Sequence, residues 1–224
     1  EQNKSFLHRV STGRPWGILK WGMSFDGRTA LTNGVSKWIT NETSRDWVHS
    51  LRGTVDAVIV GGGTVRTDDP LLTSRGKSTP EPIRVVFSRS LELPSNARVW
   101  DTSIARTLIA FPKETSEDLL ESFPEGFEKL SLPSSDPIQL LSGLAKKDCN
   151  SVLWECGPRL ASLAIKQGCI QELAIMMSPK LMGGVLAATP IAELGFTSMS
   201  EVIKLSRYEL KAFDDDLLLR ATLL

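Results

Sequence analysis

Two short apolar runs, each ending at a glycine turn that leads into a helix pattern, constrain the fold of this chain most. The first is VDAVIV at residues 55–60, which stops at Gly61 and continues as GGTVRTDD. The second is SVLWE at residues 151–155, which is broken by Cys156-Gly157-Pro158 before RLASLAIKQG. Strand–turn–helix units of this kind build parallel sheets, and the backbone N–H groups of such turns bind phosphates. The two units therefore predict an α/β fold whose glycine turns face a ligand.

The rest of the chain continues this alternation. We predict strands at WGILKWGMS, IRVVFS, RTLIAF and ELAIMMS, and helices at TNETSRDWVHSLRG, SEDLLESF and PIQLLSGLAKK. Thr40 or Asn41 is expected to cap the first of these helices. Two alternating segments, VIKLSRYELKA and LLLRATLL, flank a turn at Asp214-Asp215-Asp216. The predicted architecture is a mostly parallel central sheet with helices on both faces and an antiparallel C-terminal edge hairpin.

The length of 224 residues favours one domain with its own core. Residues 1–15 are polar and lack a clean helical or strand period, and Gly13 and Pro15 end them sharply. We predict that residues 1–15 form an N-terminal arm or linker and that residues 16–224 form a single domain.

Composition excludes several classes of function. Lys and Arg together number 26 and Asp and Glu also 26, so no net positive field attracts nucleic acid or an anionic membrane. The apolar runs are too short to cross a bilayer. The three cysteines lack C-x-x-C spacing, and His8 and His49 stand in no zinc-binding arrangement. We expect a cytoplasmic protein with free thiols and without a metal, nucleic-acid or membrane partner.

Two charged residues lie within apolar strands. Lys20 is in the middle of WGILKWGMS, and Glu155 ends SVLWE. A buried charge needs an opposite charge, a hydrogen-bond partner or a ligand. We interpret both as functional, and a structural ion pair between them is the alternative.

Arginines flank the first glycine unit. Arg52 and Arg75 carry guanidinium groups, whose paired donors match the oxygens of a terminal phosphate, and solvated surface arginines are the alternative. Arg89 follows a strand end and is a candidate for a nucleotide 2′-phosphate, again with a surface role as the alternative. Trp38 either stacks on a base or fills the core, which is the more common use of an indole.

Several motifs together resemble one family. RPWGILKWGMSFDGRTA, SKWIT, LRG, GGGTVRTDDPLLTSR and LWECGP occur here in the order found in the reductase domain of bacterial riboflavin-biosynthesis RibD proteins and the related plant reductases. The resemblance spans nearly the whole chain. It implies a dihydrofolate-reductase-like fold that binds NADPH and reduces 5-amino-6-(5-phosphoribosylamino)uracil to the ribitylamino product.

The resemblance also implies site residues. It implies catalytic positions near the reacting ribose at Lys20 and Glu155. It implies substrate contacts at Ser36, Arg52, Leu72 and Arg75. It implies NADPH contacts at Gly22, Trp38, Thr64, Asp68, Ser88, Gly157, Pro158, Arg159, Leu160, Ala161, Ser162 and Leu163.

Two features depart from the family pattern. Cys156 stands where many relatives have a second small residue before Gly157. The first residues resemble the connector that follows a deaminase domain in bifunctional relatives, so we expect a separate or fused deaminase. The resemblance further suggests a homodimer, and a plastid location if the source is plant-type. The rival functions are reduction of another pyrimidine or pteridine, and a non-catalytic partner module of a deaminase.

Overall fold

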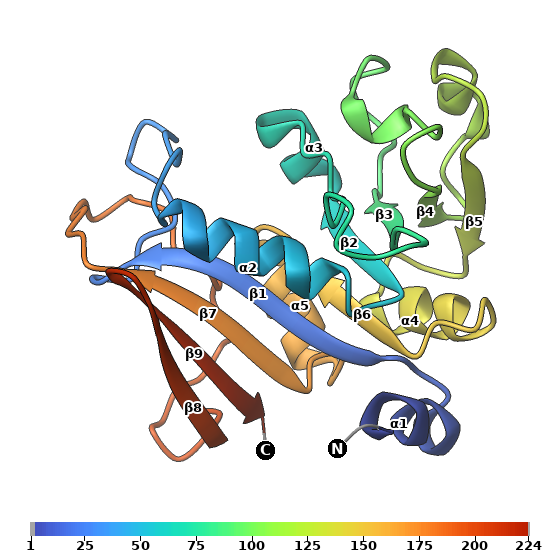
Figure 1. Cartoon of the computed structure of the whole chain (residues 1–224). Coiled ribbons are helices and arrows are strands. Elements are labelled where there is room, and N and C mark those ends of the chain that lie inside the picture. The colour runs from blue at the N-terminus through green and yellow to red at the C-terminus, as the bar shows by residue number, and fades with distance from the viewer. Residues whose placement is uncertain (1–2, 224) are drawn as a thin grey trace.

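One sheet organises the structure, a computed structural model that describes residues 3–223 (Figure 1). Across the sheet its nine strands run β5 (Glu128–Leu132), β4 (Thr107–Pro112), β3 (Ile83–Phe87), β2 (Ala57–Gly61), β6 (Ser151–Trp154), β1 (Trp16–Ser24), β7 (Glu172–Ser178), β9 (Asp216–Leu223) and β8 (Leu205–Phe213). The strands from β5 to β7 are parallel, whereas β9 is antiparallel to both β7 and β8. The predicted parallel sheet with an antiparallel C-terminal hairpin is confirmed.

Helices cover both faces of this sheet, as predicted (Figure 1). On one face, α2 (Glu42–Arg52) and α3 (Gly62–Asp68) bury Leu51 and Val65 against the sheet. On the other face, α4 (Pro137–Ala145) and α5 (Pro158–Lys166) bury Leu140 and Ala164. Two apolar cores therefore sandwich the strands, which is the usual setting of a parallel sheet.

The central strands show why the chain folds this way. In β2, Ala57 and Ile59 enter the core under α4 and α5, whereas Val58 and Val60 enter the core under α2 and α3. All four side chains are 0% exposed. Because successive side chains of a strand point to opposite faces, a short uninterrupted apolar run is what a strand buried on both faces requires.

The helix starts follow the sequence signals. Asn41 caps α2, because its side-chain oxygen accepts a hydrogen bond of 2.8 Å from the backbone N–H of Ser44. Pro158 occupies the first turn of α5, where the missing N–H costs nothing.

The N-terminal segment is a helix, contrary to its predicted lack of regular structure. It forms α1 (Lys4–Thr12), which buries no residue and ends at Gly13 with φ 71°. Polar contacts hold it instead, since Lys4 pairs with Glu172 at 2.7 Å and Arg9 donates to the side chain of Asn150 at 2.8 Å. An apolar period cannot reveal a helix that is docked through charges.

A second correction concerns SEDLLESF, predicted as an α-helix. The structure has a 3-10 helix there, η2 (Glu117–Ser122), and another short one at η1 (Arg98–Trp100). Six residues are too few to repay the nucleation of an α-helix, whereas short 3-10 pieces are common connectors. The strand β5 that follows was not predicted. No helix within residues 3–223 is long and apolar enough to cross a membrane.

Candidate active site

Lys20 and Glu155 meet on the sheet face covered by α2. Strand β1 pairs with β6 so that Leu19 lies opposite Trp154, and Lys20 and Glu155 are the next residues along each strand. Their side chains follow Ile18 and Leu153 on the α2 face by strand alternation. The Lys20 Nζ is 3.8 Å from Glu155 Oε2, and the two side chains are only 18% and 12% exposed. The alternative of an ion pair is therefore realised, between the middle of β1 and the carboxyl end of the adjacent parallel strand β6.

Arg52 adds a third charge from the last turn of α2. Its Nε lies 2.6 Å from Glu155 Oε1 and its Nη2 lies 3.1 Å from Oε2, which makes a bidentate pair. Its Nη1 donates to the carbonyl oxygen of Thr73 at 3.1 Å. The carboxylate of Glu155 thus holds two cations, and Arg52 links the end of α2 to the loop after α3.

This arrangement lowers the pKa values of both Glu155 and Lys20. Burial opposes ionisation of Glu155, but the charges of Arg52 and Lys20 outweigh burial and lower its pKa to about 2. Burial also lowers the pKa of Lys20, and Glu155 only partly offsets that effect. Glu155 is therefore a fixed carboxylate, whereas Lys20 gives up a proton more easily than an ordinary lysine. Such a lysine is suited to proton donation.

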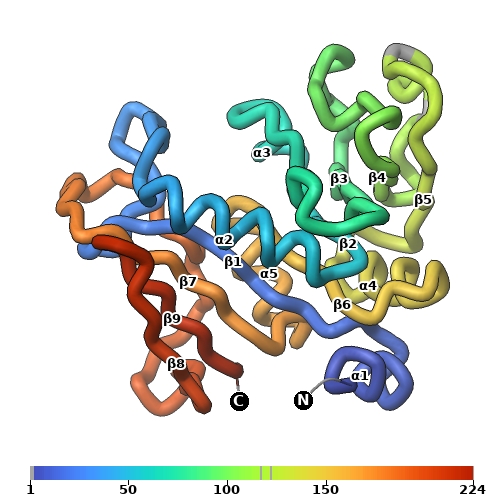
Figure 2. The backbone as a smooth tube through the Cα atoms, in the orientation of Figure 1, coloured from blue at the N-terminus to red at the C-terminus, as the bar shows by residue number. Residues whose placement is uncertain are grey.

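The loop after α3, which contains Arg75, runs beside α2 (Figure 2), because Thr73 accepts from Arg52 and Lys77 pairs with Asp46. Leu72 and Arg75 have positive φ angles of 59° and 55°. The carboxylate of Glu81 holds this conformation by accepting from the backbone N–H of Ser74 at 2.6 Å and of Gly76 at 3.0 Å. Leu72 is buried and Arg75 is exposed, so the strained loop anchors one side chain and turns the other outward.

A cleft of about 700 Å³ lies at the carboxyl ends of β2, β3 and β6. Both glycine turns border it, at residues 61–63 and at Gly157. The same cleft is lined by further residues of the predicted set, namely Ser36, Thr64, Asp68, Pro158, Arg159, Leu160 and Leu163. The strand-end position of this cleft agrees with where ligands bind to open parallel sheets.

Other predicted cofactor residues lie outside the lining of the cleft. Ala161 is buried on the sheet side of α5, and Ser162 is buried where its hydroxyl donates to the carbonyl oxygen of Ala192 in the loop after β7. Ser88 is buried and its hydroxyl accepts from the backbone N–H of Leu91 at 3.1 Å. Gly22 lies on β1 against Thr40, so these positions shape the site rather than line it.

Trp38 does not fill the core, so the core alternative for this residue is wrong. Its side chain is 64% exposed, and the guanidinium carbon of Arg45 lies 4.4 Å from the ring centroid. The backbone around it is held by Lys180, whose Nζ donates to the carbonyl oxygens of Trp38 at 3.1 Å and Ile39 at 2.6 Å. The indole therefore forms an exposed platform beside an arginine, an arrangement that suits stacking.

Sequence reasoning missed several residues that line the cleft. They include Thr29, Ala30 and Gly34 from the loop after β1, and Arg66 from α3. The signal was present, because residues after the carboxyl end of a parallel strand border the ligand site. Arg89, weighed as a candidate, also lines the cleft.

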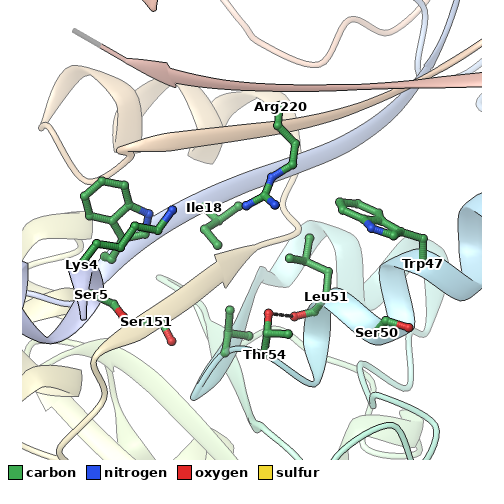
Figure 3. A pocket seen from close by; sticks show the side chains of 11 residues that line it. Lys4, Ser5, Ile18, Trp47, Ser50, Leu51, Thr54, Ser151 and Arg220 are labelled. Carbon is green, nitrogen blue, oxygen red and sulfur yellow. Dashed lines mark hydrogen bonds between the residues drawn. The ribbon is translucent and has the colours of Figure 1, made fainter. Parts of the chain in front are cut away.

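A smaller cavity of about 280 Å³ lies between α1, α2 and β1 (Figure 3). Its walls include Lys4, Trp16, Trp47 and Arg220. Glu172 pairs with both cations, at 2.7 Å from Lys4 Nζ and 2.9 Å from Arg220 Nε. Within residues 3–223, this cavity is lined by no residue predicted for the site, and it shares no lining residue with the cleft. The two are therefore separate.

Comparison with known proteins identifies the family. A family model described as the RibD C-terminal domain matches residues 15–219. The chain belongs to the RibD C-terminal domain family. The Synechocystis sp. riboflavin biosynthesis protein RibD is 40% identical over 215 residues, which are 96% of this chain and 58% of that protein. The chloroplastic riboflavin biosynthesis protein PYRR of Zea mays is 37% identical over 97% of this chain and 35% of its own length.

A solved structure agrees with the sequence relatives. The diaminohydroxyphosphoribosylaminopyrimidine deaminase/5-amino-6-(5-phosphoribosylamino)uracil reductase of Thermotoga maritima superposes with a TM-score of 0.81 at 28% identity. The match covers 99% of this chain and 60% of the Thermotoga protein. The predicted dihydrofolate-reductase-like fold of RibD reductases is thereby confirmed, and the chain spans about three fifths of the bacterial relatives it matches.

Proposed function

We propose that this chain is an NADPH-dependent reductase that converts the ribosyl group of 5-amino-6-(5-phosphoribosylamino)uracil to a ribityl group in riboflavin biosynthesis. The cluster of Lys20, Glu155 and Arg52 carries this proposal, because Glu155, two residues before the glycine turn at Gly157, holds the proton donor Lys20 at 3.8 Å. The names of the relatives support the same reaction, since one of them is a reductase of this substrate.

The residues of the cleft fit a dinucleotide cofactor. A Cβ built on Gly63 or Gly157 would have no neighbour within 4 Å, so the backbone is open to close approach there. Gly157 caps α5 without a side-chain hydrogen bond, which leaves N–H groups of the first turn for phosphates. Thr64, Asp68, residues 157–160 and Leu163 would hold the cofactor, while Ala161 and Ser162 position this part of α5 from its buried side. NADPH, when bound, supplies the hydride that C1′ of the substrate receives.

Lys20 supplies the matching proton. When the C1′–O4′ bond of the ribose breaks, O4′ needs a proton to become a hydroxyl, and C1′ becomes an iminium-like centre. Lys20, whose pKa is lowered by burial, donates that proton. Glu155 stays ionised, orients Lys20 and offsets the positive charge that develops at C1′. Arg52 fixes Glu155 through two hydrogen bonds.

Arg75 binds the phosphate of the substrate from the outside of the loop after α3. Among the described residues, its side chain makes no hydrogen bond or ion pair, so its donors are available. Ser36 on the edge of the cleft and Leu72 beneath the loop complete the predicted substrate side. The site thus offers a cation to the phosphate and a lysine to the ribose.

The wider setting of the protein is also proposed from its relatives. The Thermotoga relative combines a deaminase with the reductase, so we propose that this domain acts with a fused or separate deaminase. From the family resemblance we also propose a homodimer. A cytoplasmic location is proposed, or the plastid for a plant-type source, since the maize relative is chloroplastic.

The decisive experiment follows NADPH absorbance with enzymatically generated substrate. We expect turnover by the wild type and a loss of at least a hundredfold in kcat for Lys20→Ala and Glu155→Ala, because general acid catalysis typically contributes about that much. Lys146→Ala, an exposed lysine at the end of α4, is the matched control and should keep full activity. Binding of NADPH without turnover by the wild type would contradict the proposal.

A further inference from the structure

His49 lies one helical turn before Arg52 on α2 and is partly buried beside it. Its Nδ1 is 3.3 Å from Arg52 Nη1. A guanidinium group has only donors, so Nδ1 must be the acceptor and the single proton of the neutral imidazole lies on Nε2. The contact therefore fixes the tautomer of His49 and leaves one donor on the far side of its ring.

The hydrogen bonds of Arg52 limit what that residue can give to a ligand. A guanidinium carries five N–H bonds. Nε and Nη2 each use one on Glu155, and Nη1 uses its two on Thr73 and His49. One N–H of Nη2 is left, so Arg52 cannot grip a phosphate in bidentate fashion without breaking a contact. Further donors must come from its surroundings.

The charged groups around His49 favour an anion at this place. Arg52 and Asp46 lie on its own helix, and the charges of Arg75 in the loop after α3 and of Glu155 at the end of β6 also act on it. Asp46 is itself paired with Lys77 at 3.0 Å. Burial, and then the positive charges of Arg52 and Arg75, keep the pKa of His49 below its ordinary value. The imidazole is thus a neutral donor between two arginines at neutral pH.

We propose that His49 is a phosphate-binding residue of the substrate site, with Nε2–H donating to the phosphate monoester next to Arg75 while Nδ1 holds Arg52 in place. This inference rests on the proposed function. It assigns His49 a role in recognition of the phosphorylated sugar, separate from proton transfer at C1′.

Nuclear magnetic resonance of the imidazole signals tests the binding directly. The chain has only two histidines, so a His8→Gln variant assigns the signals of His49. Ribose 5-phosphate is the probe, and unphosphorylated ribose is its control. We expect ribose 5-phosphate to shift the His49 signals and to raise the titration midpoint of His49, because a nearby anion favours the imidazolium. No change of His49 at saturating ribose 5-phosphate, or an equal change with ribose, would overturn the inference.

Kinetics distinguish a direct contact from an effect through Arg52. We expect His49→Ala to raise KM for the phosphorylated substrate about tenfold, as loss of one hydrogen bond to a charged group would, with kcat within threefold of wild type. With the dephosphorylated substrate His49→Ala should lose at least fivefold less in kcat/KM than with the phosphorylated one, because only the support of Arg52 is then removed. His49→Gln, which keeps an acceptor and a donor, should recover part of the loss. His8→Ala is the matched control.

An equal loss with both substrates would show that His49 acts only by holding Arg52, and would refute a phosphate contact. Absence of turnover in the wild type would refute the proposed function instead, and the resonance experiment would still decide whether His49 meets a sugar phosphate.

Discussion

Replacement of Glu155 by glutamine should destabilise the protein severely. The side chains of Glu155, Arg52 and Lys20 are only 12%, 13% and 18% exposed, so glutamine would leave two cations buried without a counter-charge. Breaking a buried ion pair costs roughly 3–5 kcal/mol. At about 2–4 °C per kcal/mol for a chain of this size, the melting temperature should fall by about 6–20 °C.

Thermal unfolding followed by circular dichroism measures this change. Glu114→Gln, at an exposed position, is the matched control and should melt like the wild type. The double variant Lys20→Met/Glu155→Gln should melt higher than Glu155→Gln alone, because it removes one of the two unpaired cations. A fall of less than 2 °C in Glu155→Gln would refute the claim that these charges are buried and mutually compensated.

The same variant predicts a pH dependence of the stability difference. The folded-state pKa of Glu155 is about 2, which is below its value in the unfolded chain. The carboxylate therefore contributes its full stabilisation above about pH 4.3, the ordinary glutamate value, and loses it as the pH falls through about 2. The melting temperatures of wild type and Glu155→Gln should converge over that acidic range, provided that the wild type stays folded there.

Three further predictions test other parts of the structure. Arg89→Ala should reduce the preference for NADPH over NADH, measured as the ratio of kcat/KM for the two cofactors, because Arg89 borders the cleft; an unchanged ratio would remove it from the 2′-phosphate site. Gly17→Ala should abolish soluble expression, because its Cβ would lie 2.0 Å from the backbone oxygen of Cys169, whereas Gly63→Ala has open space and should fold. Asp26→Asn should speed proteolysis of the loop after β7, since the Asp26 carboxylate accepts from two backbone N–H groups there; equal digestion rates would contradict that role.

The sequence predicts where the strands lie and which of their side chains are buried better than it predicts which strands pair. The bounds of β1 were predicted to the residue, because an apolar run between turn residues has few other uses. The meeting of Lys20 with Glu155 appeared only as an alternative, since strand periodicity says nothing about which strands pair. The bidentate contact from Arg52 was not predicted at all, because it depends on how α2 crosses the sheet.

Residues that act outside an apolar core were the hardest to predict. Trp38 is exposed although an indole usually fills the core, because its surroundings are loop backbone and the guanidinium of Arg45. His49 belongs to no sequence motif. Its charged environment depends on the loop that contains Arg75 lying beside α2, which the sequence does not predict. Both residues owe their roles to contacts between segments that are distant in sequence.

The position of β1 in the sheet affects how the chain folds during synthesis on the ribosome. This strand is made early, yet its two sheet neighbours, β6 and β7, are made late. A nascent chain that has emerged only as far as β5 carries Lys20 on a strand with both edges unpaired and without Glu155. Such exposed edges are prone to wrong pairing, so the early part of the polypeptide is a natural client for chaperones. The cluster of Lys20, Glu155 and Arg52 is therefore assembled late, when the final third of the chain inserts around the first.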